Sequence, residues 1–299
     1  MVPGNNNKDQ GFAGGVAALT SFSVLGTYPL YFKMFSHISA FEVLAHRILW
    51  TVVLLGLFIL LSRRVQHVRA VLANRKLLVT LLLSSLLVSL NWLVFIWAVT
   101  HDMVLESSLG YFINPLFSVA LGMIFLKEKL RFWQWIAVGL SVVGVANLIG
   151  QLGTVPWIAL SVAFLFGFYG LIRKVAVVDA FSGLFIETTL ILPPILAYLI
   201  YIGVQGTGSF GSSDLTFDVL LILLGAMTAI PLILFATAAR RLRLSTLGFF
   251  QYIAPSAHFM FAVFLYNEPF TFAHQITFGM IWTALAIYTL DTIVARRKT

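Results

Sequence analysis

Residues of the same type recur at one constant spacing along this chain. Pro115 and Pro255 are separated by the same number of positions as Glu128 and Glu268, because each glutamate follows its proline thirteen residues later. We call this separation the repeat spacing. A single match between apolar sequences arises by chance, but a spacing kept over the whole length indicates a duplicated unit. We therefore predict two repeats, residues 1–150 and 151–299. The further pairs at the repeat spacing are Ala40 and Ala180, Leu44 and Leu184, Phe95 and Phe235, Ala98 and Ala238, Ile113 and Ile253, Phe132 and Phe272, and Gly139 and Gly279.

The composition places these repeats in a membrane. Hydrophobic residues make up 60% of the 299 residues and charged residues only 10%, which is more apolar surface than a soluble protein of this size buries. We expect an all-α integral membrane protein of ten transmembrane helices as two inverted five-helix repeats, because ten apolar stretches approach the ~20 residues that cross a bilayer. These stretches are 11–32, 41–61, 77–99, 104–126, 132–149, 155–172, 181–203, 217–238, 244–266 and 271–294.

The basic residues set the orientation of the predicted helices. When the connections are assigned alternately to two sides, the side with both termini holds all of the 19 Lys and Arg residues except Lys33 and Arg47. Under the positive-inside rule, that side is the cytoplasm. We therefore interpret the basic clusters as topology signals, and not as sites for nucleic acid or a specific lipid.

An odd number of helices in each repeat means that the second repeat enters the membrane from the opposite side. Glu128 then lies on the cytoplasmic side and Glu268 on the outer side. Inverted repeats are typical of alternating-access transporters, which bind their substrate near the midplane where the repeats meet. Inverted duplicates also occur in channels and in proteins without a transport role, so the pattern favours transport without naming a substrate.

Pro115 and Pro255 each lie near the middle of a predicted helix. A proline removes one helical hydrogen bond and displaces the carbonyl four residues earlier, which here belongs to Tyr111 or Gln251. A freed carbonyl is costly in hydrocarbon unless protein or cavity water satisfies it. The two kinks are either packing features or hinges in the wall of a central cavity, and their matched positions favour the cavity. Polar side chains stand beside them at Tyr111, Asn114, Gln251, Tyr252 and His258.

Two ionisable residues lie inside predicted helices at matching positions. Arg47 and Glu187 are separated by the repeat spacing and carry opposite charges. Each costs roughly 2.5–3.5 kcal/mol near the bilayer centre, so a partner or water is expected. One interpretation is structural, with contacts to backbone carbonyls, lipid headgroups or each other. The alternative is a gate or a coupling site.

Catalytic and cofactor motifs are absent from the sequence. It contains no His-Glu-x-x-His, no Walker A loop and no carboxylate-rich metal cluster. Without cysteine the chain has no disulfide and no thiolate metal site. We expect no enzymatic activity, no cofactor, no metal and no ATPase partner. The expected partners are a small-molecule substrate and the lipid bilayer.

Short motifs occur through both halves of the chain. Residues 45–50 read Ala-His-Arg-Ile-Leu-Trp, residues 108–115 Ser-Leu-Gly-Tyr-Phe-Ile-Asn-Pro, residues 169–174 Tyr-Gly-Leu-Ile-Arg-Lys, residues 251–255 Gln-Tyr-Ile-Ala-Pro and residues 268–270 Glu-Pro-Phe. Together they resemble the RarD branch of the EamA transporters, in the drug/metabolite transporter superfamily. The resemblance implies a ten-helix carrier in the bacterial inner (plasma) membrane. Helices three, four, eight and nine, with parts of one and six, would line a central cavity, and helices five and ten would be peripheral.

The resemblance also suggests a substrate class, since related YddG-type exporters move amino acids outward, aromatic ones among them. We therefore expect a secondary transporter that exports small amphipathic metabolites by alternating access, with hydrophobic or aromatic amino acids as the leading substrates. The alternatives are a drug or toxic-metabolite efflux carrier and a membrane interaction protein without transport activity.

An amino-acid zwitterion needs partners for two charges and cover for its side chain. The freed carbonyls would accept from the ammonium, amide and phenol groups would donate to the carboxylate, and aromatic rings would cover the side chain. The predicted substrate-binding residues are Asn91, Trp92, Tyr111, Asn114, Phe249, Gln251 and Tyr252, and the predicted hinges are Pro115 and Pro255.

Overall fold

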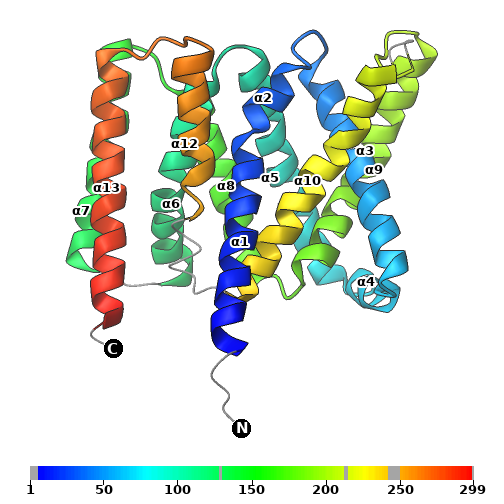
Figure 1. Ribbon diagram of the computed structural model, residues 1–299, viewed down its shortest axis with the longest axis horizontal. Helices are drawn as coiled ribbons and strands as arrows, with labels where there is room; N and C mark the ends of the chain where they lie inside the picture. The colour runs from blue at the N-terminus through cyan, green and yellow to red at the C-terminus, as the bar shows by residue number, and fades with distance from the viewer. Residues whose placement is uncertain (1–5, 128–129, 212–214, 242–249, 298–299) are drawn as a thin grey trace.

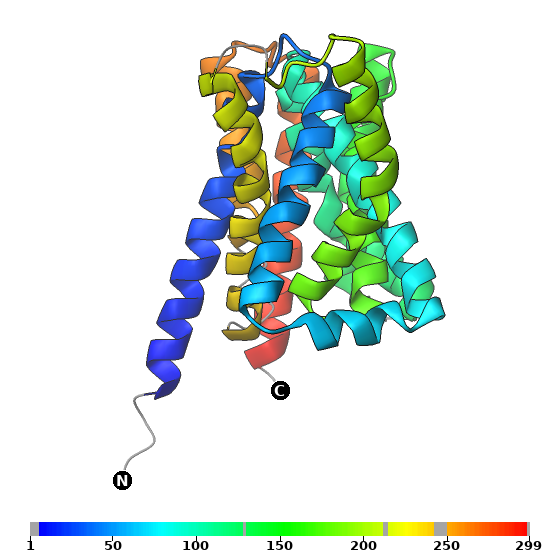
Figure 2. The same cartoon turned by 90° about the vertical axis from the view of Figure 1, so that its right-hand side faces the viewer.

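The protein is a bundle of helices that lie side by side (Figures 1 and 2). The computed structural model describes residues 6–127, 130–211, 215–241 and 250–297. Within these residues every regular element is a helix. In chain order the elements are α1 (Asn6–Gly26), α2 (Tyr28–Lys33), α3 (Ala40–Leu61), α4 (Val65–Leu72), α5 (Arg75–Thr100), α6 (Val104–Leu126), α7 (Phe132–Leu152), α8 (Trp157–Val175), α9 (Ala180–Val204), α10 (Leu215–Arg241), α12 (Ile253–Met260), the π-helix η1 (Phe261–Leu265) and α13 (Phe272–Arg297).

Within the described residues, six helices are long and apolar enough to cross a bilayer, and they lie within α3, α5, α6, α7, α9 and α10. Residues 157–173 and 253–265 form shorter apolar helices. α13 has 26 residues and overlaps the predicted span 271–294, while α1 has 21 residues and covers only part of the predicted span 11–32. Of the predicted span 244–266, residues 244–249 lie outside the described residues, and residues 253–265 form α12 and η1.

The first predicted span, residues 11–32, is two helices rather than one. α1 ends at Gly26 and α2 begins at Tyr28, with Pro29 in its first turn. Because Pro29 has no N–H, it cannot bond to the carbonyl of Leu25, four residues earlier. The connection 62–76 also contains an element that hydropathy does not predict, the short helix α4, which lies across the end of the bundle where α1 begins (Figure 2).

Helices from the first half of the chain pack against helices from the second half. In three pairs of helices the first residues are separated by the repeat spacing, namely α3 and α9, α5 and α10, and α7 and α13. α3 packs on both α9 and α10, α1 packs on α10, and α8 packs between α5 and α6. α7 and α13 pack along each other at one edge of the bundle (Figure 1), which agrees with the peripheral place expected for the fifth and tenth helices.

α3 and α10 approach closely enough to require a glycine. A Cβ atom added to Gly225 of α10 would lie 2.5 Å from the carbonyl carbon and oxygen of Trp50 in α3. Only the absence of a side chain allows the two backbones this approach. The contact places Thr228, one turn further along α10, beside Arg47 of α3.

Candidate functional site

Five aromatic side chains meet in the interior of the bundle, and we call them the Phe95 cluster: Tyr28, Phe32, Phe95, Tyr111 and His258. The ring of Phe95 on α5 lies 6.4 Å from that of Tyr28 and 5.9 Å from that of Phe32, both on α2. It lies 5.7 Å from Tyr111 of α6 and 5.3 Å from His258 of α12. Such edge-on and tilted contacts suit aromatic rings, so the cluster ties residues from both halves of the chain to one point.

Arg47 of α3 borders this cluster. Its guanidinium carbon lies 4.2 Å from the centroid of the Trp92 ring and 5.4 Å from those of Tyr28 and Phe32. The Nε atom donates a hydrogen bond of 2.9 Å to Thr228 Oγ1 of α10. The residue is only 3% exposed, and its Nη1 atom is buried without a hydrogen-bond partner. Among the described residues no carboxylate forms an ion pair with it.

Asn91 joins three helices beside the cluster. Its side chain is fully buried on α5, and its Nδ2 atom donates to the carbonyl of Val162 on α8 at 3.1 Å. The hydroxyl of Tyr111 on α6 donates to Asn91 Oδ1 at 3.3 Å. These two bonds fix the orientation of the amide and leave it one further N–H to donate.

Near the cluster, two prolines leave a backbone carbonyl without its helical hydrogen bond. In each case a side chain from another helix contacts that carbonyl. The Leu25 carbonyl, freed by Pro29, lies 3.0 Å from Nε2 of His258. The Met227 carbonyl, freed by Pro231 within α10, accepts from the Tyr28 hydroxyl at 2.5 Å. The physical rule applied above to Pro115 and Pro255 thus operates at two prolines where the sequence reasoning did not apply it.

The structure brings some of the predicted substrate residues together and separates others. Tyr111 belongs to the Phe95 cluster, Asn91 is hydrogen-bonded to Tyr111, and Trp92 stacks on Arg47, which borders the cluster. Asn114 has a buried Oδ1 without a hydrogen-bond partner. Gln251 is exposed, and Phe249 lies outside the described residues. Tyr252 instead lines a groove of ≈ 360 Å³ with Phe112, Ser256, Trp282, Leu285, Ala286 and Thr289, between α6, α12 and α13.

The two predicted hinge prolines occupy different positions in their helices. Pro115 lies within α6, and its side chain is not among those described. Pro255 lies in the first turn of α12, which begins at Ile253. At that position the missing N–H has no helical acceptor to lose, so Pro255 starts a helix and does not kink the middle of one.

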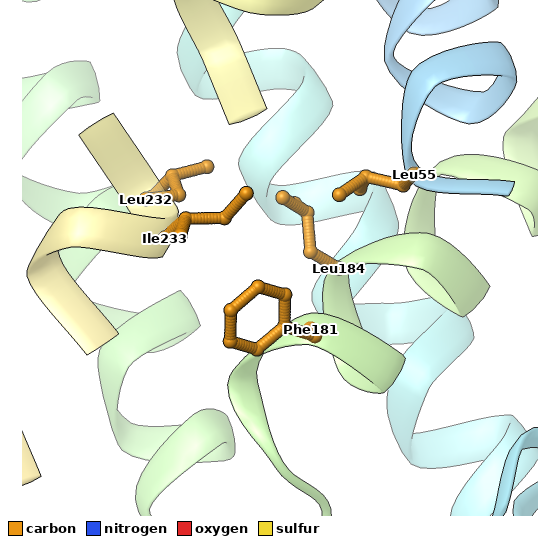
Figure 3. Close-up of a pocket in the computed structure, with 5 residues that line it drawn as sticks. All are labelled: Leu55, Phe181, Leu184, Leu232 and Ile233. Carbon is orange, nitrogen blue, oxygen red and sulfur yellow. The ribbon is translucent and has the colours of Figure 1, made fainter. Parts of the chain in front are cut away.

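A small apolar cavity is lined by none of the residues of the Phe95 cluster (Figure 3). It has a volume of ≈ 10 Å³ and is lined by Leu55, Phe181, Leu184, Leu232 and Ile233, from α3, α9 and α10. Its lining offers a ligand no polar side chain, and an apolar void of this size stays dry. It is a packing defect and not a candidate site for a polar metabolite.

Glu187, the other predicted intramembrane charge, has partners of its own. It is 1% exposed on α9, and Oε1 lies 3.6 Å from Nη1 of Arg173. The hydroxyls of Ser84 and Tyr169 donate to its carboxylate, the second over 3.5 Å. Glu187 and Arg47 therefore do not pair with each other, and Glu187 holds α9 to α5 and α8.

Carboxylates also connect the halves where α6 and α8 begin. Glu268 accepts from the backbone N–H groups of Val104 and Leu105 at 2.8 and 2.7 Å, at the N-terminus of α6. Glu106 accepts from the N–H of Ile158 at 3.1 Å, at the start of α8. Each negative charge meets the positive end of a helix from the other half.

Known proteins are similar to this chain over nearly its whole length. The model of the EamA-like transporter family matches residues 12–150. The protein RarD of Salmonella typhi is 45% identical, over 95% of this chain and 97% of that protein. RarD of Escherichia coli is 42% identical, over 96% and 97%, and an uncharacterized transporter of Vibrio cholerae is 43% identical, over 99% and 97%. The chain belongs to the EamA-like transporter family, in its RarD branch.

This EamA-family protein is therefore a membrane transporter, as its relatives are named. A solved crystal structure of a protein with 18% sequence identity is similar over 93% of this chain and 97% of that protein's chain, with a TM-score of 0.57. At that identity, the likeness extends to the fold alone.

Several residues at the centre of this EamA transporter escaped the sequence reasoning. Tyr28, Phe32 and Thr228 were not singled out, although they surround Arg47. Pro29 and Pro231 are the sequence features that could have indicated these residues. Each lies in a predicted span and leaves a backbone carbonyl for which a neighbouring helix must supply a donor. Which neighbour does so depends on how the helices pack.

Proposed function

We propose that this transporter exports small amphipathic metabolites, with hydrophobic and aromatic amino acids as its substrates. The observation that carries the proposal is the composition of its buried centre. Trp92 and the Phe95 cluster offer aromatic faces, while Asn91 and the hydroxyl of Tyr111 offer uncharged polar groups that hydrogen-bond to each other. Asn114 follows Tyr111 by one turn of α6 and has a buried Oδ1 atom without a partner. Aromatic faces suit an apolar or aromatic side chain, and amide and phenol groups suit the backbone charges of an amino acid.

The proposed mechanism is alternating access by two inverted repeats, residues 1–150 and 151–299. Its support is that three helix pairs begin at the repeat spacing and that α3 packs on its counterpart α9, and α7 on its counterpart α13. In this scheme ten helices cross the membrane and the repeats rock against each other about the Phe95 cluster. The proposed flexion points are Pro115, inside α6, and Pro255, in the first turn of α12.

The proposed orientation places both termini in the cytoplasm of a bacterium, with the protein in the inner membrane. The skewed distribution of the 19 Lys and Arg residues supports it. The carboxylate caps formed by Glu268 and Glu106 then lie on the outer side, where they would hold that side closed.

The proposed substrate contacts are those that the sequence predicts. The contacts that support Asn91, Trp92 and Tyr111 are the hydrogen bond between Asn91 and Tyr111 and the stacking of Trp92 on Arg47. Asn114 is proposed because its buried Oδ1 has no hydrogen-bond partner. Gln251 and Tyr252 stay in the proposed set because they directly precede α12, whose His258 belongs to the Phe95 cluster. Phe249, which lies outside the described residues, stays in the set on its position in the sequence alone.

Counterflow in proteoliposomes tests the proposal. Vesicles loaded with an unlabelled amino acid should accumulate the same labelled amino acid faster than protein-free vesicles, and phenylalanine and leucine should exceed aspartate and lysine. The matched pair is Tyr111→Phe, at the buried centre, and Tyr201→Phe, on the 63% exposed Tyr201 of α9. Only the first should change transport. No counterflow for any amino acid would refute the proposed substrate class.

A drug efflux carrier is the second candidate. A relative from Pseudomonas aeruginosa named "Chloramphenicol-sensitive protein RarD" is 29% identical over 95% of this chain, and the Phe95 cluster would also suit an aromatic drug. Counterflow of labelled chloramphenicol, without counterflow of any amino acid, would favour this candidate.

A further inference from the structure

We propose that the guanidinium of Arg47 docks the carboxylate of the transported substrate. This inference rests on the proposed function, since it requires a small metabolite to reach the centre of the bundle, and it assigns the ligand's chemistry. The substrate class is a monocarboxylate with an aromatic or aliphatic body, which includes the zwitterionic amino acids.

The first argument is that no carboxylate among the described residues forms an ion pair with Arg47. Arg47 is 3% exposed, and its Nη1 atom is buried without a partner. Several other cations of the described chain do pair with carboxylates: Arg173 with Glu187, Arg131 with Asp291 and Lys33 with Asp102. A buried charge without a counter-ion is strongly disfavoured. The protein therefore keeps a cation ready for an anion that comes from elsewhere.

The second argument is the way in which Arg47 is held. Its Nε atom is committed to Thr228 at 2.9 Å, and the Trp92 ring covers one face of the guanidinium at 4.2 Å. Stacking and a single hydrogen bond fix the plane of the group, while Nη1 stays free to donate. A guanidinium fixed in this way is prepared for a charge-assisted bond to a planar carboxylate.

The third argument is the aromatic surroundings of the guanidinium group. The rings of Tyr28 and Phe32 lie 5.4 Å from the guanidinium carbon, and both contact Phe95. A carboxylate at Arg47 would place the body of the substrate against aromatic walls. One guanidinium balances one negative charge, so a second carboxylate on the ligand would remain uncompensated in this apolar setting.

The position of Arg47 also connects binding to conformational change. Arg47 and Trp92 come from the first half of the chain and Thr228 from the second. In this scheme, separation of α3 from α10 exposes the guanidinium of Arg47 to the substrate. When the two helices close again, the bound carboxylate compensates the positive charge of Arg47. Closing an empty site leaves the charge unpaired, so the bound substrate favours the closed state.

Competition binding tests the inference with two compounds, each of which carries only one of the two charged groups of an amino acid. The probes are 3-phenylpropionate, which has the carboxylate and no ammonium, and phenethylamine, which has the ammonium and no carboxylate. They are titrated against the counterflow of labelled L-phenylalanine, and their effect on the melting temperature of the purified protein is measured separately. In wild type we expect 3-phenylpropionate to compete and to stabilise the protein.

Arg47→Gln should weaken competition by 3-phenylpropionate at least tenfold and abolish its thermal shift, while the effect of phenethylamine stays unchanged. Arg131→Gln is the matched control, because it removes a paired arginine at the peripheral contact of α7 with α13, and it should change neither probe. If Arg47→Gln keeps wild-type affinity for 3-phenylpropionate, the inference is wrong.

Two further outcomes are distinguishable. If wild type transports no amino acid but 3-phenylpropionate still stabilises it in an Arg47-dependent way, the amino-acid proposal fails and the carboxylate site stands. If Arg47→Gln does not fold, Arg47→Lys carries the test. It keeps the charge and loses the planar fork, so 3-phenylpropionate should bind several-fold more weakly, and unchanged binding would contradict the inference.

Discussion

The hydroxyl of Tyr28 donates a hydrogen bond to the backbone carbonyl of Met227 at 2.5 Å. In an unbroken helix this carbonyl would accept from the N–H of residue 231, but Pro231 has none. A tyrosine near the start of the chain thus repairs a defect in α10, in the other half of the sequence. The same bond holds Tyr28 beside Arg47.

Tyr28→Phe removes this donor and leaves the rest of the ring in place. A buried carbonyl without a partner costs about 1–3 kcal/mol, so we expect the melting temperature of the purified protein in detergent to fall. Tyr201→Phe, at an exposed position on α9, is the control and should melt like wild type. Equal melting temperatures for both variants would mean that the Met227 carbonyl is satisfied in another way.

The sequence predicts the helices of this protein better than it predicts their contacts. The span expected at 104–126 is observed as Val104–Leu126, and that at 41–61 as Ala40–Leu61, because a bilayer requires continuous apolar runs. The span 11–32 is divided because Pro29 interrupts its hydrogen bonds. α4 was missed because eight residues with mixed polarity give no signal of a membrane span.

The candidate site was predicted in part. Asn91 and Tyr111 were chosen separately as polar groups, and the structure joins them by a hydrogen bond. Arg47 was identified as an intramembrane charge, but its stacking on Trp92 depends on how α3 packs against α5. Helix periodicity describes the faces of one helix, and it does not say which neighbour meets them.

Asp179 gives a prediction about acid stability. It caps α9 by accepting from the N–H groups of Phe181 and Ser182 at 3.1 Å each, and His67 Nε2 lies 2.9 Å away. Burial alone would raise its pKa, but the bonds from Ser182 and Phe181 and the nearby His67 hold the pKa of Asp179 below its ordinary 3.8. Its contribution to stability is therefore complete above pH 3.8 and is lost as the pH falls through the folded-state pKa.

Asp179→Ala should lower the free energy of unfolding by about 0.5–2 kcal/mol at pH 7, the usual cost of an N-cap. The difference from wild type should shrink as the pH drops below 3.8. Melting curves over a pH series measure it, and a difference that persists unchanged in acid would assign the loss to packing and not to the carboxylate.

Glu268 should show the opposite dependence on pH. Burial raises the pKa of Glu268 above its ordinary 4.5, although the N–H groups of Leu105 and Val104 partly oppose the shift. The folded protein then binds the proton more tightly than the unfolded chain does. The contribution of Glu268 to stability therefore falls as the pH rises from 4.5 through the folded-state pKa.

Glu268→Gln removes this titration. We expect the stability of wild type relative to Glu268→Gln to decrease with rising pH above 4.5, as measured by melting temperature in detergent. The Asp179→Ala series is an internal comparison, because its trend has the opposite sign. If the two proteins keep a constant difference from pH 4 to pH 8, the carboxyl of Glu268 does not titrate as proposed.

Gly225→Ala tests the close approach of α10 to α3. Its new Cβ would lie 2.5 Å from the Trp50 carbonyl group, so the helices must separate, at a cost of about 1–3 kcal/mol. Because Thr228 and Arg47 lie at the same contact, we also expect slower transport. Gly279→Ala on α13 is the control, since a Cβ there meets nothing within 4 Å and should be neutral or slightly stabilising.

The central claim is that an amino acid passes through the buried centre of this transporter, and the selectivity of counterflow tests it most directly. The measurement is the ratio of phenylalanine to serine counterflow in proteoliposomes for wild type and for Trp92→Ala, Tyr111→Ala, Asn114→Ala and Gln251→Ala. We predict that the two aromatic truncations change this ratio, whereas the Asn114 and Gln251 variants lower both fluxes together. Wild-type flux and selectivity in all four folded variants would contradict the account, because the substrate would then cross elsewhere.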